Sequence, residues 1–184
     1  LSLEVPVVNT PPSIARVALD PEAPVAGDVL VASAESSYDP DGDPIIVELS
    51  WQLNGVDAGI GLLGEGALPA DAVFDQPLFR GDQVLVRAVP FDLEAQGVAV
   101  TTTVVVENTP PEVTGVSFSP DPPQSGQDVE ILATTTDVDG DVPSLTVRWR
   151  VNGGSTIVAP VLPSAAIQPG DVLTVDVRAF DGFD

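Results

Sequence analysis

Two short acidic loops hold the side chains best placed to do chemistry. They share three aspartates at alternate positions, with a glycine before the last: Asp39, Asp41 and Asp43, then Asp137, Asp139 and Asp141. Carboxylates spaced in this way can turn their oxygens toward one hard cation, and Ca²⁺ accepts about six to eight oxygen ligands. The spacing therefore predicts two Ca²⁺ sites. The competing interpretation is that these aspartates cap their own turns by accepting hydrogen bonds from backbone amides.

Two further carboxylates are expected beside these loops. Asp92 and Asp181 each follow a phenylalanine at the end of a strand-like segment. In a sandwich of two sheets, the loop after the second strand and the loop after the penultimate strand lie at the same end. We therefore add Asp92 to the first predicted ion site and Asp181 to the second. The loops do not match an EF-hand, because their twelfth positions hold Ser50 and Arg148 in place of glutamate.

The sequence elements that position these loops occur twice along the chain, as an internal repeat. The tetrapeptide Asn-Thr-Pro-Pro stands at residues 9–12 and again at 108–111, 99 residues later. This interval is about the length of one small β-sandwich domain. We predict one domain over residues 10–108 and a second over 109–184, with residues 1–9 as the last strand of a preceding or neighbouring domain.

Alternating apolar residues predict that both domains are built of short β-strands. Trp51 lies mid-strand on an apolar face, and Asn54-Gly55 then marks a hairpin turn. Trp149 holds the same position in the second copy, and we expect both tryptophans in cores. Residues 56–79 are rich in glycine and alanine, and one or two short strands are expected there. The whole pattern predicts an all-β protein of two tandem immunoglobulin-like β-sandwiches.

The chain begins with a strand-like segment and ends before the corresponding strand of its second copy. Residues 1–8 alternate in the same phase as residues 100–107, and Asp184 corresponds to Ala95. The second domain is therefore expected to lack its final strand, which would leave an open sheet edge. We expect residues 1–8 to fill that edge in another copy, giving head-to-tail assembly, or the same contact to join successive units of one long chain.

The charge of the chain limits its partners. The formal net charge is −22, and all six basic residues are arginine. Repulsion by phosphates argues against nucleic acid, and no apolar run is long enough for insertion into a membrane. Cations are the natural small partners, although an acidic surface also serves simply to keep a protein soluble. Cysteine, methionine and histidine are absent, which agrees with an extracellular or cell-surface location.

The composition does not favour catalysis, and we predict that the chain is not an enzyme. Paired carboxylates would suit a glycosidase, but the acidic loops are short and the aromatic content is only 5%. A serine nucleophile would lack a histidine base. The expected function is that of a structural or adhesive module. The alternative is an accessory or carbohydrate-binding module of a secreted enzyme.

The order of the repeated motifs resembles that of bacterial immunoglobulin-like extracellular repeats. The first copy has, in order, Asn-x-Pro-Pro, Gly-Asp, Asp-x-Asp-Gly-Asp, Trp-x-x-Asn-Gly, a second Gly-Asp and Phe-Asp, and the second copy repeats this order with Gly126-Gln127-Asp128 in place of the first Gly-Asp. Such repeats are similar to PKD, cadherin-like and fibronectin type III modules. The resemblance implies a β-sandwich that serves as a spacer or adhesive unit, and the cadherin-like arrangement implies ions that stiffen the domain junction near Asn108. Residues 51–55, Trp-Gln-Leu-Asn-Gly, depart from the Trp-Asp-Phe-Gly-Asp-Gly of PKD repeats.

Overall fold

The chain folds into two units made of β-strands. The computed structural model describes residues 2–64 and 73–183, so Leu1 of the predicted first strand, part of the predicted strand region 56–79 and Asp184 lie outside the described residues. Unit 1 is Leu1–Glu107 and unit 2 is Asn108–Asp184. The division falls one residue earlier than the predicted boundary.

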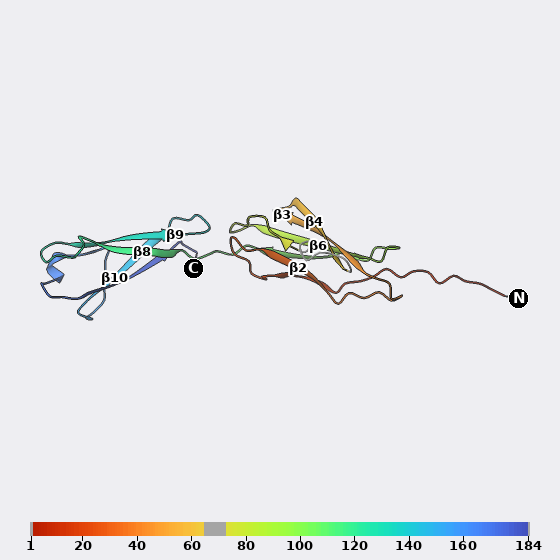
Figure 1. The fold of residues 1–184 in the computed structure, drawn as a ribbon, viewed down its shortest axis with the longest axis horizontal. Helices are drawn as coiled ribbons and strands as arrows, with labels where there is room; N and C mark the ends of the chain where they lie inside the picture. Colours follow the sequence, from red (N-terminus) through yellow and green to blue (C-terminus); the bar gives the residue numbers. More distant parts are fainter. Residues whose placement is uncertain (1, 65–72, 184) are drawn as a thin grey trace. The chain divides into compact units, whose positions relative to one another are not determined.

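Unit 1 is an immunoglobulin-like sandwich of two antiparallel sheets. One sheet has the order β1-β2-β5, with bounds β1 Arg16–Asp20, β2 Leu30–Glu35 and β5 Val73–Phe74. The other has the order β4-β3-β6-β7, with bounds β3 Ile46–Leu53, β4 Val56–Gly64, β6 Gln83–Phe91 and β7 Val100–Val105. Figure 1 shows β3, β4 and β6 in one layer of this unit and β2 in the other.

The core of unit 1 follows from the period of two along its strands. Alternate side chains of β3 turn inward, and Trp51 is 3% exposed with its ring centroid 5.3 Å from that of Phe74. Asn54 and Gly55 both have positive φ angles, 52° and 78°, as the two-residue hairpin between β3 and β4 requires. The predicted strand, hairpin and core tryptophan are confirmed.

Strand β7 closes the open side of unit 1. It pairs with β6 from Val100 to Val105, and Val100 and Val104 pack against the core. The hydroxyl of Thr102 donates a hydrogen bond to the carbonyl of Val17 on β1. Since β7 lies over β1 in this way, Val17 is only 1% exposed.

In its described residues, up to Phe183, unit 2 repeats the sandwich without a strand in the place of β7. One sheet has the order β12-β9-β8, with bounds β8 Glu112–Ser119, β9 Val129–Thr136 and β12 Val161–Leu162. The other has the order β11-β10-β13, with bounds β10 Ser144–Val151, β11 Ile157–Val158 and β13 Leu173–Phe180. Within the described ranges, β13 is an edge strand, whereas its counterpart β6 has neighbours on both sides.

The core of unit 2 is correspondingly less covered. Trp149 is fully buried, as predicted, and its indole N–H donates to the carbonyl of Ala159 over 2.9 Å. Val116, which occupies on β8 the place of Val17 on β1, is 46% exposed against 1%. The difference lies on the side that β7 covers in unit 1.

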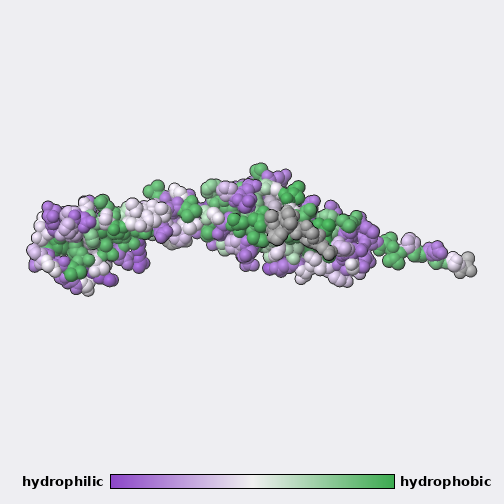
Figure 2. Space-filling view, viewed as in Figure 1, coloured by the Kyte–Doolittle hydropathy of each residue, from purple (hydrophilic) through white to green (hydrophobic). Residues whose placement is uncertain are grey.

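The segment before unit 1's first strand is extended and apolar. Its described residues from Ser2 to Asn9 belong to no strand, and Val5 and Val7 are 73% and 95% exposed. Figure 2 shows the green apolar residues of this segment open to solvent. Its role as a strand of another domain therefore stays a prediction. Among the described residues, no helix is long and apolar enough to cross a bilayer.

Candidate functional site

The first acidic loop, between β2 and β3, is organised around one carboxylate. Asp39 is 8% exposed. Its Oδ1 accepts hydrogen bonds from the backbone amides of the residues that follow, Asp41 (2.8 Å), Gly42 (2.9 Å) and Asp43 (3.2 Å). Gly42 has a φ of 85°, a conformation that glycine adopts without strain. This is the turn-capping arrangement, in which Asp43 takes part through its backbone amide.

Two further carboxylates beside this loop accept hydrogen bonds from the segment that precedes the first strand of unit 1. Asp41 Oδ2 accepts a hydrogen bond from the amide of Thr10 over 2.6 Å. Asp92, only 4% exposed, accepts one from the side-chain amide of Asn9 over 3.0 Å. The structure thus brings Asp41 and Asp92, 51 residues apart, to consecutive residues of the entering segment. We call this pair of contacts the linker latch.

Unit 2 has a linker latch of the same design. The side-chain amide of Asn108 donates to Asp181 Oδ2, and the backbone amide of Thr109 donates to Asp139 Oδ2, each over 2.8 Å. Asp137 caps the loop, because its Oδ1 accepts from the amides of Asp139 (2.8 Å) and Asp141 (3.4 Å). The repeated geometry shows that the two copies share the arrangement as well as the motifs.

The carboxylates of these loops are also the ones predicted to bind Ca²⁺. Within residues 2–64 and 73–183, no group of three or more acidic side chains is placed to hold an ion. The Oδ2 atoms of Asp39 and Asp137 are buried and accept no hydrogen bond, and a cation is one group that would satisfy them. Ca²⁺ binding therefore stays a prediction, and the hydrogen bonds of these loops are those of capped turns and a held linker.

The linker latch also sets the electrostatics of Asp92. The hydrogen bond from the Asn9 amide lowers the pKa of the Asp92 carboxyl, and the backbone amides of Ala95 and Glu94 lower it further. Each donor favours the charged form. Asp92 Oδ1 lies 2.8 Å from both amides. The group is therefore held as a carboxylate that accepts hydrogen bonds.

Sequence reasoning found the carboxylates but not what they bind. The partners are the asparagine and threonine that open each Asn-Thr-Pro-Pro tetrapeptide. The available signal was the recurrence of this tetrapeptide together with the acidic loops. An asparagine side chain that donates to a distant aspartate leaves no local pattern, however, because the contact depends on tertiary packing.

Comparison with solved structures finds distant likenesses. No family model and no curated protein matches the chain. The crystal structure of the chicken CNTN1 FN1-FN3 domains is similar at 13% identity and a TM-score of 0.38, over 94% of this chain and 61% of that one. The apo structure of Bacteroides uniformis beta-glucuronidase 3 is similar at 11% identity and a TM-score of 0.27, over 90% of this chain and 24% of that one. This chain thus spans less than two thirds of either, and the fold is defined by its own sheets and cores.

The substitution Asn9→Ala tests the latch through the pKa of Asp92. Without the donor, the pKa of Asp92 should rise toward the ordinary aspartate value of about 3.9. The folded pKa lies below the unfolded one, so this contribution to stability is present above about pH 4 and is lost as the pH falls through the folded pKa. Asn9→Ala should therefore be less stable at pH 7 and lose less stability on acidification.

An NMR titration of the Asp92 carboxyl carbon, with urea unfolding at pH 7 and pH 2, measures both effects. Asn108→Ala is the matched control, because its side chain contacts Asp181 and should leave the pKa of Asp92 unchanged. The same Asp92 pKa in wild type and in Asn9→Ala would contradict the latch.

Proposed function

We propose that this chain is a structural and adhesive repeat module of an extracellular surface protein or filament, in which β-strand complementation joins one unit to the next. The observation that carries the proposal is the unpaired outer edge of β13, at the place where β7 pairs with β6 in unit 1. An edge strand of this kind offers a row of backbone donors and acceptors to an incoming strand.

Residues 1–8 have the pattern that such a strand needs. In the described segment, Leu3, Val5 and Val7 alternate with polar or outward positions, and they stand 99 residues before Thr102, Val104 and Val106. In unit 1 those three counterparts face the core side of β7. The exposed apolar side chains of one copy thus match the uncovered core of unit 2, where Val116 is 46% exposed.

The linker latch supports a mechanical role for the acidic loops. It fixes the first residues of each unit to two loops of that unit, so the entering chain has a defined direction before the first strand. The lowered pKa of Asp92 keeps that side chain charged and hydrogen-bonded, which argues against a general-acid role for Asp92, because a general acid needs a raised pKa near neutral pH. The net charge of −22 and the absence of cysteine and methionine suit an extracellular location.

Deleting residues 1–8 should abolish end-to-end association of the chain. The chain of residues 1–184 is expected to show concentration-dependent oligomers in sedimentation velocity and filaments in electron microscopy, and the form without residues 1–8 should stay monomeric. Unfolding of unit 1, followed at Trp51, is the control. It should be unchanged by the deletion, since the deleted segment belongs to no strand of unit 1. Polymers of the truncated form would contradict the proposal.

Ca²⁺ at the acidic loops is the second part of the proposal. We expect calorimetry to show Ca²⁺ binding and the melting temperature to rise with Ca²⁺ and fall with chelator, because the ion would satisfy the buried Oδ2 of Asp137. Asp137→Asn should abolish that binding while its remaining side-chain oxygen still accepts the capping hydrogen bonds. No heat of binding and identical melting with and without chelator would leave turn capping as the sole role of the loop.

A further inference from the structure

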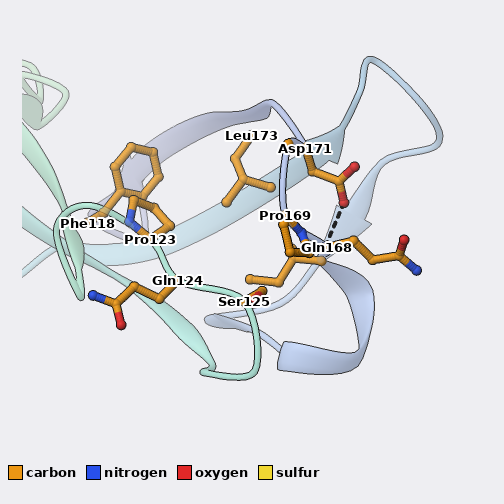
Figure 3. A pocket seen from close by; sticks show the side chains of 10 residues that line it. Phe118, Pro123, Gln124, Ser125, Gln168, Pro169, Asp171 and Leu173 are labelled. Carbon is orange, nitrogen blue, oxygen red and sulfur yellow. Dashed lines mark hydrogen bonds between the residues drawn. The ribbon is translucent and has the colours of Figure 1, made fainter.

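One end of unit 2 holds a pocket of about 270 Å³. It lies between the loop that follows β8 and the loop that precedes β13. Its lining includes Phe118, Pro123, Ile167, Gly170, Asp171 and Leu173. In Figure 3, Phe118 and Pro123 lie at the left of the view, and Leu173, Pro169 and Asp171 lie to their right. The apolar part of the lining is continuous with the core, since Ile167 belongs to the core cluster and Phe118 and Leu173 pack against it.

The same place in unit 1 is occupied by the end of β7. Val106 is 2% exposed and belongs to the core. Its amide donates to the carbonyl of Asp82 over 2.8 Å, and its carbonyl accepts from the amide of Gly81 over 2.9 Å. The next amide, of Glu107, donates to the carbonyl of Pro24 over 2.7 Å. Three backbone hydrogen bonds thus hold Val106 and Glu107 in place, with the side chain of Val106 in the core.

The residues that make these contacts have counterparts in the pocket. Pro24, Gly81 and Asp82 correspond to Pro123, Gly170 and Asp171, which line the pocket of unit 2. Two core residues also correspond, because Leu78 and Val84 of unit 1 align with Ile167 and Leu173. The pocket is therefore the unit 2 version of the space that Val106 fills.

The wall of the pocket already has the conformation seen around Val106. Asp171 accepts hydrogen bonds from the Asn152 side chain (2.7 Å) and the Gln168 amide (2.8 Å). Asp82 accepts the equivalent bonds, from the Asn54 side chain (2.8 Å) and the Phe79 amide (2.9 Å). The φ angles of the preceding glycines agree, 93° at Gly170 and 84° at Gly81. The site is preformed, which lowers the ordering cost of binding.

We propose that this pocket is the anchor socket of the assembly, and that it receives the side chain of Val7 from a second copy of this chain. The proposal rests on the strand complementation proposed above, and it names the residue that sets the register. Val7 stands 99 residues before Val106 and is 95% exposed. Because a slip of one residue would turn every side chain of the strand to the other face, one buried anchor fixes the alignment.

The residues on both sides of Val7 suit the same register. In a strand, the N–H and C=O of one residue point to one side and those of its neighbours to the other. Val106 directs both groups toward the β6 side, so the amide of Val105 points away from it. Pro6 stands at the position of Val105, where a missing N–H removes no bond to the acceptor strand. Val8 stands at the position of Glu107.

Charge substitutions at two adjacent positions of the full chain test the socket. Val7→Glu should weaken self-association at least about tenfold in sedimentation velocity, because it would place a carboxylate against the core side chains Ile167 and Leu173 and beside the carboxylate of Asp171. Val8→Glu is the matched control and should associate like wild type, since glutamate already occupies that position in unit 1. A synthetic peptide of residues 2–10, added to the full chain, should shift the NMR methyl signals of Ile167 and Leu173.

The outcomes separate the socket from the strand complementation on which it rests. If wild type and both variants associate equally, the socket is wrong, and strand complementation is then decided separately by the deletion of residues 1–8. Equal loss of association in both variants, or peptide-induced shifts away from Ile167 and Leu173, would also overturn the socket. If wild type itself does not associate and the peptide does not bind, both proposals fail.

Discussion

The structure depends on one constraint, which is that the apolar side chains between the two sheets of a β-sandwich must be covered along the sides of the core as well as on its faces. In unit 1, β7 meets this need by pairing with β6 and covering Val17. In unit 2 the described strands leave the outer edge of β13 unpaired and the equivalent Val116 half exposed. Edge exposure of this kind promotes pairing with another chain. The proposed assembly and its anchor socket both derive from this difference between two otherwise matching units.

The acidic loops contribute a second feature that both units share. Carboxylates in each unit accept hydrogen bonds from loop amides and from the first residues of the entering segment. Carboxylates make strong hydrogen bonds to backbone amides, and at this end of the sandwich they fix where the chain enters. In the proposed assembly, residues 1–8 pair with another copy and the next two residues, Asn9 and Thr10, are held by the linker latch of unit 1. The two contacts together would give each junction a defined geometry.

Much of the fold could be predicted because its signals are local. The alternation around Trp51, the Asn54-Gly55 turn and the 99-residue spacing depend only on nearby residues or on self-similarity. The one or two short strands expected in residues 56–79 are present as β4 and β5, but their bounds could not be predicted, because these glycine-rich residues have no clear period. The partners of Asp41 and Asp92 could not be predicted, because one spacing of carboxylates suits an ion, a capped turn or a held linker. Pairing of the open edge of β13 with another strand could not be predicted from this sequence either, because it depends on the surface of a second chain.

Amide hydrogen exchange along β13 tests the central constraint most directly. The account predicts that the β13 amides that do not pair with β10 exchange fast in dilute protein, whereas the β6 amides that pair with β7 are protected. Raising the protein concentration, or adding a peptide of residues 2–10, should protect those β13 amides. Protection of the outer β13 edge in dilute monomer, or none at any concentration of protein or peptide, would contradict the account.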